Sequence, residues 1–285
     1  MAPAGCPAGG RDFVQSFSFF AFKHPVLAEI RKLPGYRELI VNFTLREIKG
    51  KYKQAFFGVA WAMIQPIVLM LILTLVFSYI AGIRSDGIPY PVFLFAGLLP
   101  WQFFSGALTR GTNALVNQAS LITKVYFPRE SLVVSSMAAA MVDFGITTLV
   151  FIALLIYYRV APTVHWLWIV PLLLTQMTLA LGLMLILAPL NTLYRDVGQA
   201  VPLAMQLWMY ATPLMYPATL VPASIRPYYF LNPMAVLIEG YRDAIFRNTA
   251  PDPWRFLYVV VIAGAVLIAG YSLFKRLERT MADVA

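Results

Sequence analysis

Charged residues are missing from long stretches of the chain, and this spacing predicts membrane-spanning helices. The charge-free stretches are Gln54–Ile83, Gly87–Thr109, Val160–Tyr194, Val197–Ile225 and Phe256–Phe274. A further apolar run, from 131 to 158, is interrupted only by Asp143. Since a helix needs about 20 apolar residues to cross a bilayer, we expect an all-α integral membrane protein. The six expected spans lie at about 57–82, 92–112, 131–157, 166–189, 198–217 and 254–274.

Two of the connecting segments have patterns of their own. In the segment 34–53, apolar residues recur at helical spacing between charged ones, which predicts an amphipathic helix along the membrane surface. The segment 217–252 is apolar but broken by Pro222, Pro227 and Pro233. Broken backbone at membrane depth is tolerated only against protein or a water-filled cavity. We therefore expect two short re-entrant helices on the outer side.

These patterns divide the chain into an N-terminal extension (1–34), an interface helix (35–53) and a transmembrane domain (54–285). With both termini cytoplasmic, 16 of the 22 lysines and arginines fall on the inner side, as the positive-inside rule requires. The first ten residues lack the basic and apolar regions of a cleavable signal peptide. We expect a multi-pass protein of a bacterial inner membrane.

The amino-acid composition limits the kinds of site and ligand that we expect for this chain. Of the 285 residues, 60% are hydrophobic and 12% are charged, whereas soluble domains carry about a quarter charged residues. One cysteine, Cys6, and two distant histidines, His24 and His165, indicate no metal site and no cofactor held by this chain. The net charge of +9 comes from residues beside the spans, which favours anionic lipid, an acidic partner or an anionic substrate over nucleic acid.

No catalytic motif is visible. Gly50-Lys51 lacks the earlier glycine and the following Ser or Thr of a phosphate-binding loop, and no nucleophile elbow or zinc-protease helix occurs. We expect a non-enzyme whose driving force comes from a partner or an ion gradient. Asp143, inside a span, is a functional candidate by position, with Arg110 as an expected partner. Both a structural ion pair and a direct role in transport are open.

Six motifs follow one another in an order typical of one family. They are REIKGKYK with GVAW and QP (46–66), YPVFLFAGLLPW (90–101), LITKVYFPRE (121–130), YRDV (194–197), TPLMYP (212–217) and LNPM (231–234). From about Arg37 to Arg279 the chain resembles polysaccharide-exporting ABC-2 type permeases, most closely the Wzm-like O-antigen permeases, with capsule and teichoic-acid permeases as relatives. It departs from them in its longer segment 1–34 and in Leu193-Tyr194, where two aromatics are frequent.

The resemblance implies a homodimer bound to two separate ATPase subunits, which hold ATP and Mg. This assembly would export a polysaccharide linked to polyprenyl pyrophosphate. The resemblance also implies that the surface helix and the segment around 121–130 contact the ATPase. The expected contact residues are Arg46, Glu47, Lys49, Lys124, Tyr126, Phe127, Arg129 and Glu130. The basic residues could instead be simple membrane anchors, although Glu47 favours a specific contact.

The same resemblance predicts three further groups of functional residues. Two of these groups also have a simpler structural explanation. Aromatic rings pack on sugar faces, and the channel candidates are Trp61, Phe103, Phe104, Trp208 and Tyr210; ordinary packing is the alternative. Candidate ligands of the lipid pyrophosphate are Lys51, Lys53 and Arg195. A polar outer gate is expected from Glu239, Arg242, Asp243 and Arg247, unless these residues merely form salt bridges with one another.

Other functions are weighed against this one. A gradient-driven secondary transporter predicts inverted repeats with matched broken helices, and no convincing repeat is visible. A non-transporting membrane scaffold is a third class. Arginine outnumbers lysine, 15 to 7, which suggests a GC-rich bacterium and favours O-antigen over teichoic acid.

Overall fold

The computed structural model describes residues 36–53, 56–83, 85, 87–122, 127–222 and 224–284. These residues form helices and turns and contain no strand, so the expected all-α class is confirmed. The predicted extension 1–34 and two predicted ATPase contacts, Lys124 and Tyr126, lie outside the described residues.

Five helices in the described part of the chain are long and apolar enough to cross a membrane. They cover Gly58–Ile80, Tyr90–Asn113, Glu130–Tyr157, Val164–Leu193 and Pro253–Glu278. The first combines α4 (Trp61–Thr74) with a short 3-10 turn before it and a π-helical end after it. The others contain α5 (Tyr90–Asn113), α7 (Glu130–Tyr157), α8 (Ile169–Leu193) and α12 (Pro253–Val284). They coincide with five of the six predicted spans.

The predicted span 198–217 is shorter in the structure. Its helix, α9, covers Val197–Tyr210, only 14 residues, which is about 21 Å at the usual rise per residue. A bilayer core is about 30 Å thick. The helix ends here because Pro213 has no N–H to donate and disfavours helical geometry at Thr212. A complete sixth span is therefore not confirmed.

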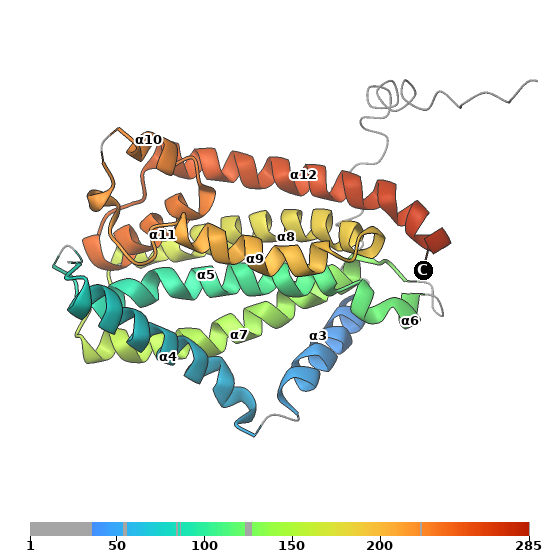
Figure 1. Ribbon diagram of the computed structural model, residues 1–285, viewed down its shortest axis with the longest axis horizontal. Helices are drawn as coiled ribbons and strands as arrows, with labels where there is room; N and C mark the ends of the chain where they lie inside the picture. Colours follow the sequence, from blue (N-terminus) through green and yellow to red (C-terminus); the bar gives the residue numbers. More distant parts are fainter. Residues whose placement is uncertain are drawn as a thin grey trace, which may run out of the picture.

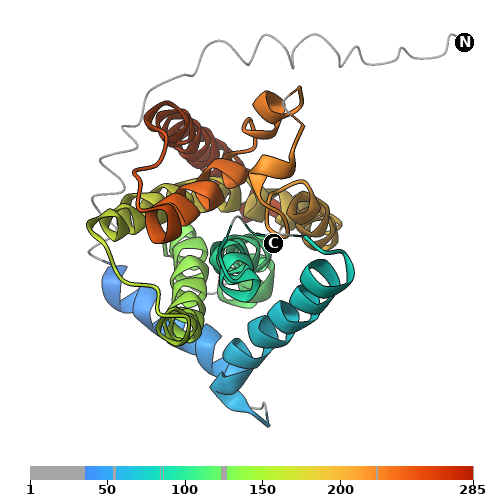
Figure 2. The same cartoon turned by 90° about the vertical axis from the view of Figure 1, so that its left-hand side faces the viewer.

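The helix α5 forms the centre of the bundle. Figure 2, which looks along the bundle, shows it surrounded by the other long helices. Four consecutive residues, Val92 to Phe95, are fully buried. Because four consecutive positions point to all sides of a helix, α5 is covered all round, as expected for a helix that is apolar on every face.

The helices α8 and α12 approach each other most closely at two glycines. A Cβ atom on Gly270 would lie 2.3 Å from the carbonyl oxygen of Gly182, and one on Gly182 would lie 2.7 Å from the amide nitrogen of Leu267. Small residues allow this backbone approach, as they do in other membrane helix pairs.

A helix, α3 (Arg37–Tyr52), occupies the segment predicted to be the interface helix. It runs obliquely to the bundle in Figure 1, at the same end as α6 (Ala119–Ile122) and the C-terminus. Leu39 and Phe43 pack against the core, and the Thr44 hydroxyl lies 3.4 Å from the Ser135 carbonyl oxygen of α7. One face of α3 is thus held by the bundle.

The opposite end of the bundle carries the short helices α10 (Arg226–Tyr229) and α11 (Pro233–Arg242), followed by a π-helical turn, Asp243–Arg247 (Figure 1). Asn232 caps α11, because its side-chain oxygen accepts a hydrogen bond from the Met234 amide at 3.0 Å. Capping satisfies a donor that the first turn of a helix would otherwise leave unpaired.

Candidate functional site: a polar pocket beside Asp143

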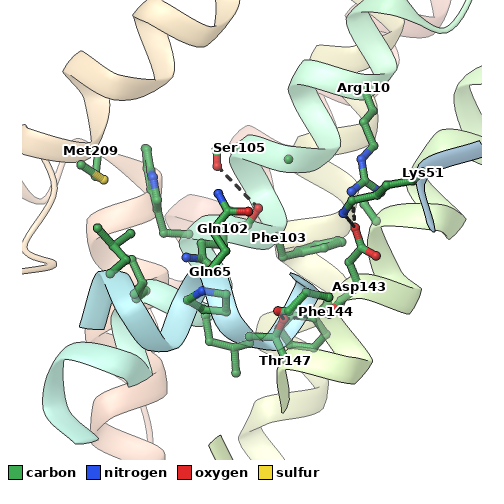
Figure 3. Close-up of a pocket in the computed structure, with 18 residues that line it drawn as sticks. Lys51, Gln65, Gln102, Phe103, Ser105, Arg110, Asp143, Phe144, Thr147 and Met209 are labelled. Atoms are coloured by element: carbon green, nitrogen blue, oxygen red, sulfur yellow. Dashed lines mark hydrogen bonds and ion pairs between the residues drawn. The ribbon is translucent and has the colours of Figure 1, made fainter. Parts of the chain in front are cut away.

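A pocket of about 320 Å³ lies between α4, α5 and α7. Its polar lining includes Gln65, Gln102, Ser105 and Thr147, and its aromatic lining is Trp101, Phe103 and Phe144. Figure 3 shows Gln65, Gln102, Phe103, Phe144 and Thr147 around one space. We call it the central pocket. Amides and hydroxyls beside flat aromatic faces are suited to a polar ligand that also has apolar faces.

A charged cluster lines one side of the central pocket. The Asp143 carboxylate of α7 accepts hydrogen bonds from the Lys51 ammonium at 2.6 Å and from the Tyr52 hydroxyl at 2.5 Å. It is also ion-paired with Arg110 of α5. In Figure 3, Lys51 and Arg110 both point toward Asp143. We call these four residues the Asp143 cluster.

The cluster explains how a span can contain a carboxylate. A charge inside a membrane protein is costly unless it is paired and hydrogen-bonded, and here one carboxylate receives three donors. Burial and the neighbouring Asp143 raise the pKa of the Tyr52 hydroxyl, so this group stays protonated and donates. The Lys51 side chain remains 44% exposed. This side of the pocket therefore reaches the surface.

Glu47 lies one turn earlier on α3 and also faces α7. Its carboxylate accepts a hydrogen bond from the Ser136 hydroxyl at 3.0 Å. Burial raises the pKa of Glu47, while the Ser136 hydrogen bond and the charge of Arg110 oppose this rise. Arg46 and Lys49 are exposed. The predicted ATPase-contact residues of α3 are thus divided between an inward-facing glutamate and two outward-facing cations.

Three further predicted ATPase-contact residues are described by the structure, and they join the start of α7 to neighbouring helices. They are Phe127, Arg129 and Glu130. Phe127 packs on Phe43 of α3, with ring centres 5.6 Å apart. Glu130 is buried and ion-paired with Lys275 of α12 at 3.0 Å. Arg129 donates to the Glu278 carbonyl oxygen at 3.1 Å. This segment is therefore fixed to both α3 and α12.

The predicted channel aromatics are found in different surroundings. Phe104 is 0% exposed and contacts Trp101 and Trp208, the latter with ring centres 5.4 Å apart. The Trp208 indole donates to Asn232 at 2.9 Å. Phe104 therefore packs in the core in this conformation, and its role in a channel stays a prediction. Phe103 lines the central pocket, and Tyr210 is 57% exposed.

Trp61 is also exposed and lies at the start of α4, where its ring contacts Phe57. Among the predicted pyrophosphate ligands, Lys51 belongs to the Asp143 cluster. Lys53 and Arg195 are exposed, after α3 and between α8 and α9 respectively. The central pocket includes Lys51 in its lining but neither of the other two.

The predicted outer gate residues form a network of salt bridges. Glu239 pairs with Arg242 at 2.9 Å and with Arg247 at 3.0 Å, and Arg247 pairs with Asp243 at 2.6 Å. Arg242 is 0% exposed and also donates to the carbonyl oxygens of Pro213 and Leu214. A buried guanidinium needs such partners. Arg242 therefore holds the α11 end together and does not lie on an exposed rim.

Sequence reasoning missed several polar residues that organise the bundle. The Gln176 amide donates to the Pro100 carbonyl oxygen at 2.6 Å and accepts from the Tyr241 hydroxyl at 3.0 Å. Asn191 donates to the Thr112 carbonyl oxygen at 3.0 Å and accepts from the Gly198 amide at 2.7 Å. Their occurrence in charge-free stretches was the available indication, because a buried polar group requires a partner.

Within the described ranges, no three His, Cys, Asp or Glu side chains are grouped so that they could hold a metal ion. The absence of a metal or cofactor in this chain stays a prediction.

A bundle with five helices long and apolar enough to cross a membrane is typical of a multi-pass membrane protein. The chain belongs to the ABC-2 type transporter family, whose family model matches residues 38–246. The resemblance seen in the sequence motifs is thereby confirmed.

Named relatives extend this similarity over most of the chain. An O-antigen export system permease protein RfbA from Myxococcus xanthus is 31% identical over 256 residues, covering 89% of this chain and 98% of that protein. An RfbA protein from Klebsiella pneumoniae is 29% identical, with coverage of 87% and 95%. The polysialic acid transport protein KpsM from Escherichia coli is 22% identical, with coverage of 83% and 92%.

Proposed function

We propose that this chain is the transmembrane permease subunit of an ATP-driven exporter of O-antigen polysaccharide linked to polyprenyl pyrophosphate. The observation that carries the proposal is the 31% identity to an O-antigen export permease over 98% of that protein's length. Similarity to the capsule-type protein KpsM is lower, at 22%, so O-antigen is preferred to capsular polysaccharide. Membership of the ABC-2 family favours ATP over an ion gradient as the driving force.

The central pocket supports a polysaccharide substrate. Sugars present CH faces that pack on aromatic rings and hydroxyls that bond to amides. Trp101 and Phe103 supply rings, and Gln65 and Gln102 supply amides. The exposed face of α9 adds Gln199 and Gln206. An amide facing lipid is costly, so this face suits a water-filled passage or a second copy of the chain.

The proposed topology has six spans, both termini on the cytoplasmic side and the α11 end facing the periplasm of the inner membrane. The sixth span would be α9 extended by residues 211–217, with α10 and α11 re-entering the outer leaflet. The shielding of this non-helical segment supports the arrangement, because Arg242 binds the carbonyl oxygens of Pro213 and Leu214. Non-helical backbone at membrane depth needs such protein partners.

The proposed partners are a second copy of this chain and two ATPase subunits, which bind ATP and Mg. The outward face of α3 supports an ATPase contact there. Arg46, Lys49 and Lys53 line an open hollow of about 610 Å³ on this face. Cations around a concave surface attract an acidic partner or anionic lipid. This subunit would supply no catalytic group itself.

Co-expression with an ABC ATPase from the same gene cluster tests the proposal. The two proteins should co-purify, and lipid-linked O-antigen should stimulate ATP hydrolysis by the complex in proteoliposomes. A matched complex whose ATPase lacks its catalytic glutamate controls for contaminating hydrolysis. If the chain purifies alone and the glycan lipid leaves hydrolysis unchanged, the proposal is wrong.

A further inference from the structure

Two residues on one face of α7 hold the end of α3 and the start of α4. Asp143 binds Lys51 and Tyr52, which form the last turn of α3. Thr147, one turn further along α7, donates to the Ala62 carbonyl oxygen in the first turn of α4 at 3.1 Å. Positions four apart lie on the same side of a helix. Asp143 and Thr147 also line the central pocket.

The chain leaves the bundle directly beyond these contacts. Phe56 is 95% exposed, and Phe57 is also exposed. Among the described residues, Lys51 and Tyr52 hold the end of α3 to the bundle through Asp143, and α4 supplies Gln65 and Pro66 to the pocket wall. A displacement of the last turn of α3 would act directly on the side of the pocket that Lys51 lines.

The partners of Asp143 differ in how easily they can leave. Arg110 belongs to α5, which packs along α7 within the bundle. Lys51 and Tyr52 belong to α3, and the Lys51 ammonium already reaches solvent. If the last turn of α3 moved away, Asp143 would keep Arg110 as its counter-ion. An unpaired buried charge, the costly outcome of breaking such a cluster, would not arise.

Glu47 offsets part of the positive charge of the Asp143 cluster. Its carboxylate also faces Arg110 and Asp143 from α3. Two cations therefore face two carboxylates, and the closed cluster holds no surplus positive charge for an anionic ligand. The geometry favours a mechanical role for the Asp143 cluster over a permanent phosphate site.

We propose that Asp143 is a positioning residue that couples α3 to the central pocket. Lys51 and Tyr52 form a releasable latch on Asp143, and its release widens the opening of the pocket to the surface. This inference rests on the proposed function, in which the outward face of α3 receives the ATPase. A displacement of α3 by the ATPase would then expose the pocket to the glycan.

Thiol labelling tests the latch without requiring transport. Cys6 is replaced by Ser, and Ser105→Cys places a thiol in the pocket lining. The reporter is combined with Lys51→Met and Tyr52→Phe, which remove the two releasable donors and keep the pair of Asp143 with Arg110. A small charged thiol reagent should label the latch variant at least about threefold to tenfold faster, because that factor corresponds to the net worth of one hydrogen bond and two are removed.

Matched controls separate a latch from a general loosening. Lys53→Met removes a neighbouring lysine that does not line the central pocket and should leave the labelling rate unchanged. Lys51→Arg keeps a cation and should restore the slow rate when Tyr52 is intact. Equal labelling of the parent and the latch variant would overturn the inference, as would equal acceleration by Lys53→Met.

A second measurement examines coupling in the complete complex with its ATPase. The latch variant should export less glycan per ATP hydrolysed than the parent, whereas a variant that is merely unstable would lose export and hydrolysis in proportion. An unchanged export ratio contradicts the latch. If the parent complex moves no glycan, the proposed function fails, and the labelling result still decides whether the latch exists.

Discussion

The guanidinium of Arg242 lies 3.7 Å from the centre of the Phe93 ring, and this contact joins α11 to the first turn of α5. A cation above an aromatic face is stabilised by the ring quadrupole, most strongly where water is excluded. The salt bridge to Glu239 and the bonds to the backbone after α9 complete the surroundings of Arg242. The α11 end is thus fixed to the core of the bundle.

Replacing Arg242 should therefore destabilise the whole protein. Arg242→Met removes one partner of a buried ion pair and leaves two carbonyl oxygens without their donor. We expect a loss of about 3 kcal/mol, the lower end for such pairs, because Arg247 still pairs with Glu239. The measurement is the apparent melting temperature in detergent, which should fall clearly.

Arg255 provides the matched control for this change. It has the same kinds of contact, an ion pair with Asp252 at 3.5 Å and a position 3.9 Å from the Phe230 ring centre, but it is about half exposed. Exposed pairs contribute about 0–1 kcal/mol, so Arg255→Met should shift the melting temperature little. Equal falls in melting temperature for the two substitutions would show that burial does not determine how much Arg242 stabilises the protein.

The contact between α8 and α12 should not tolerate even one added methyl group. Gly270→Ala places a Cβ against the Gly182 carbonyl oxygen, and backbone cannot move aside as a side chain can. We expect a loss of about 1–3 kcal/mol, measured as a lower melting temperature. Gly264→Ala on the same helix meets no atom within 4 Å and should be neutral. A neutral Gly270→Ala would contradict the close approach.

Substitutions of two aromatic residues should distinguish a role in packing from a role in transport. Phe104→Ala empties a buried site and should cost about 3–5 kcal/mol, so export falls because less protein is folded. Tyr210→Ala changes an exposed ring, where substitutions usually stay within about 0.5 kcal/mol, and should reduce glycan export without a change in melting temperature. Normal surface glycan in a stable Tyr210→Ala variant would assign this ring to lipid or to packing.

The outward cations of α3 should control assembly with the ATPase. Arg46→Glu with Lys49→Glu reverses two exposed charges and should abolish co-purification of the ATPase while the bundle stays folded. Arg159→Glu is the control, since this exposed arginine follows the far end of α7. Undiminished co-purification of the double variant would place the ATPase contact elsewhere.

The long helices could be predicted from sequence because an uncharged stretch of sufficient length has few alternatives to a buried or membrane-spanning helix. The short helix α9 could not be predicted from the charge spacing alone, since residues 211–217 are as free of charge as the helix before them. Pro213 and Pro217 were the available indications of its end. The inward position of Glu47 was also available, because it follows Leu39 and Phe43 at intervals of four residues on the buried face of α3.

The contact partners of the site residues were harder to predict from the sequence. Helical spacing brings Glu239 near Arg242 and Asp243 near Arg247, but Phe93 lies on another element, far away in the sequence. The same holds for Asp143, whose partners Lys51 and Tyr52 come from α3. Contacts between distant segments depend on how the helices pack, and the pattern of a single sequence does not determine that packing.

The central claim is that this chain moves a lipid-linked polysaccharide with energy from a partner ATPase. The most direct measurement reconstitutes the chain with its ATPase in proteoliposomes that carry lipid-linked O-antigen on the ATPase side. The glycan on the opposite side is then followed with a lectin or antibody. We expect ATP-dependent appearance of the glycan there, and none with a non-hydrolysable ATP analogue. Appearance at the same rate without ATP or without the ATPase would contradict the account.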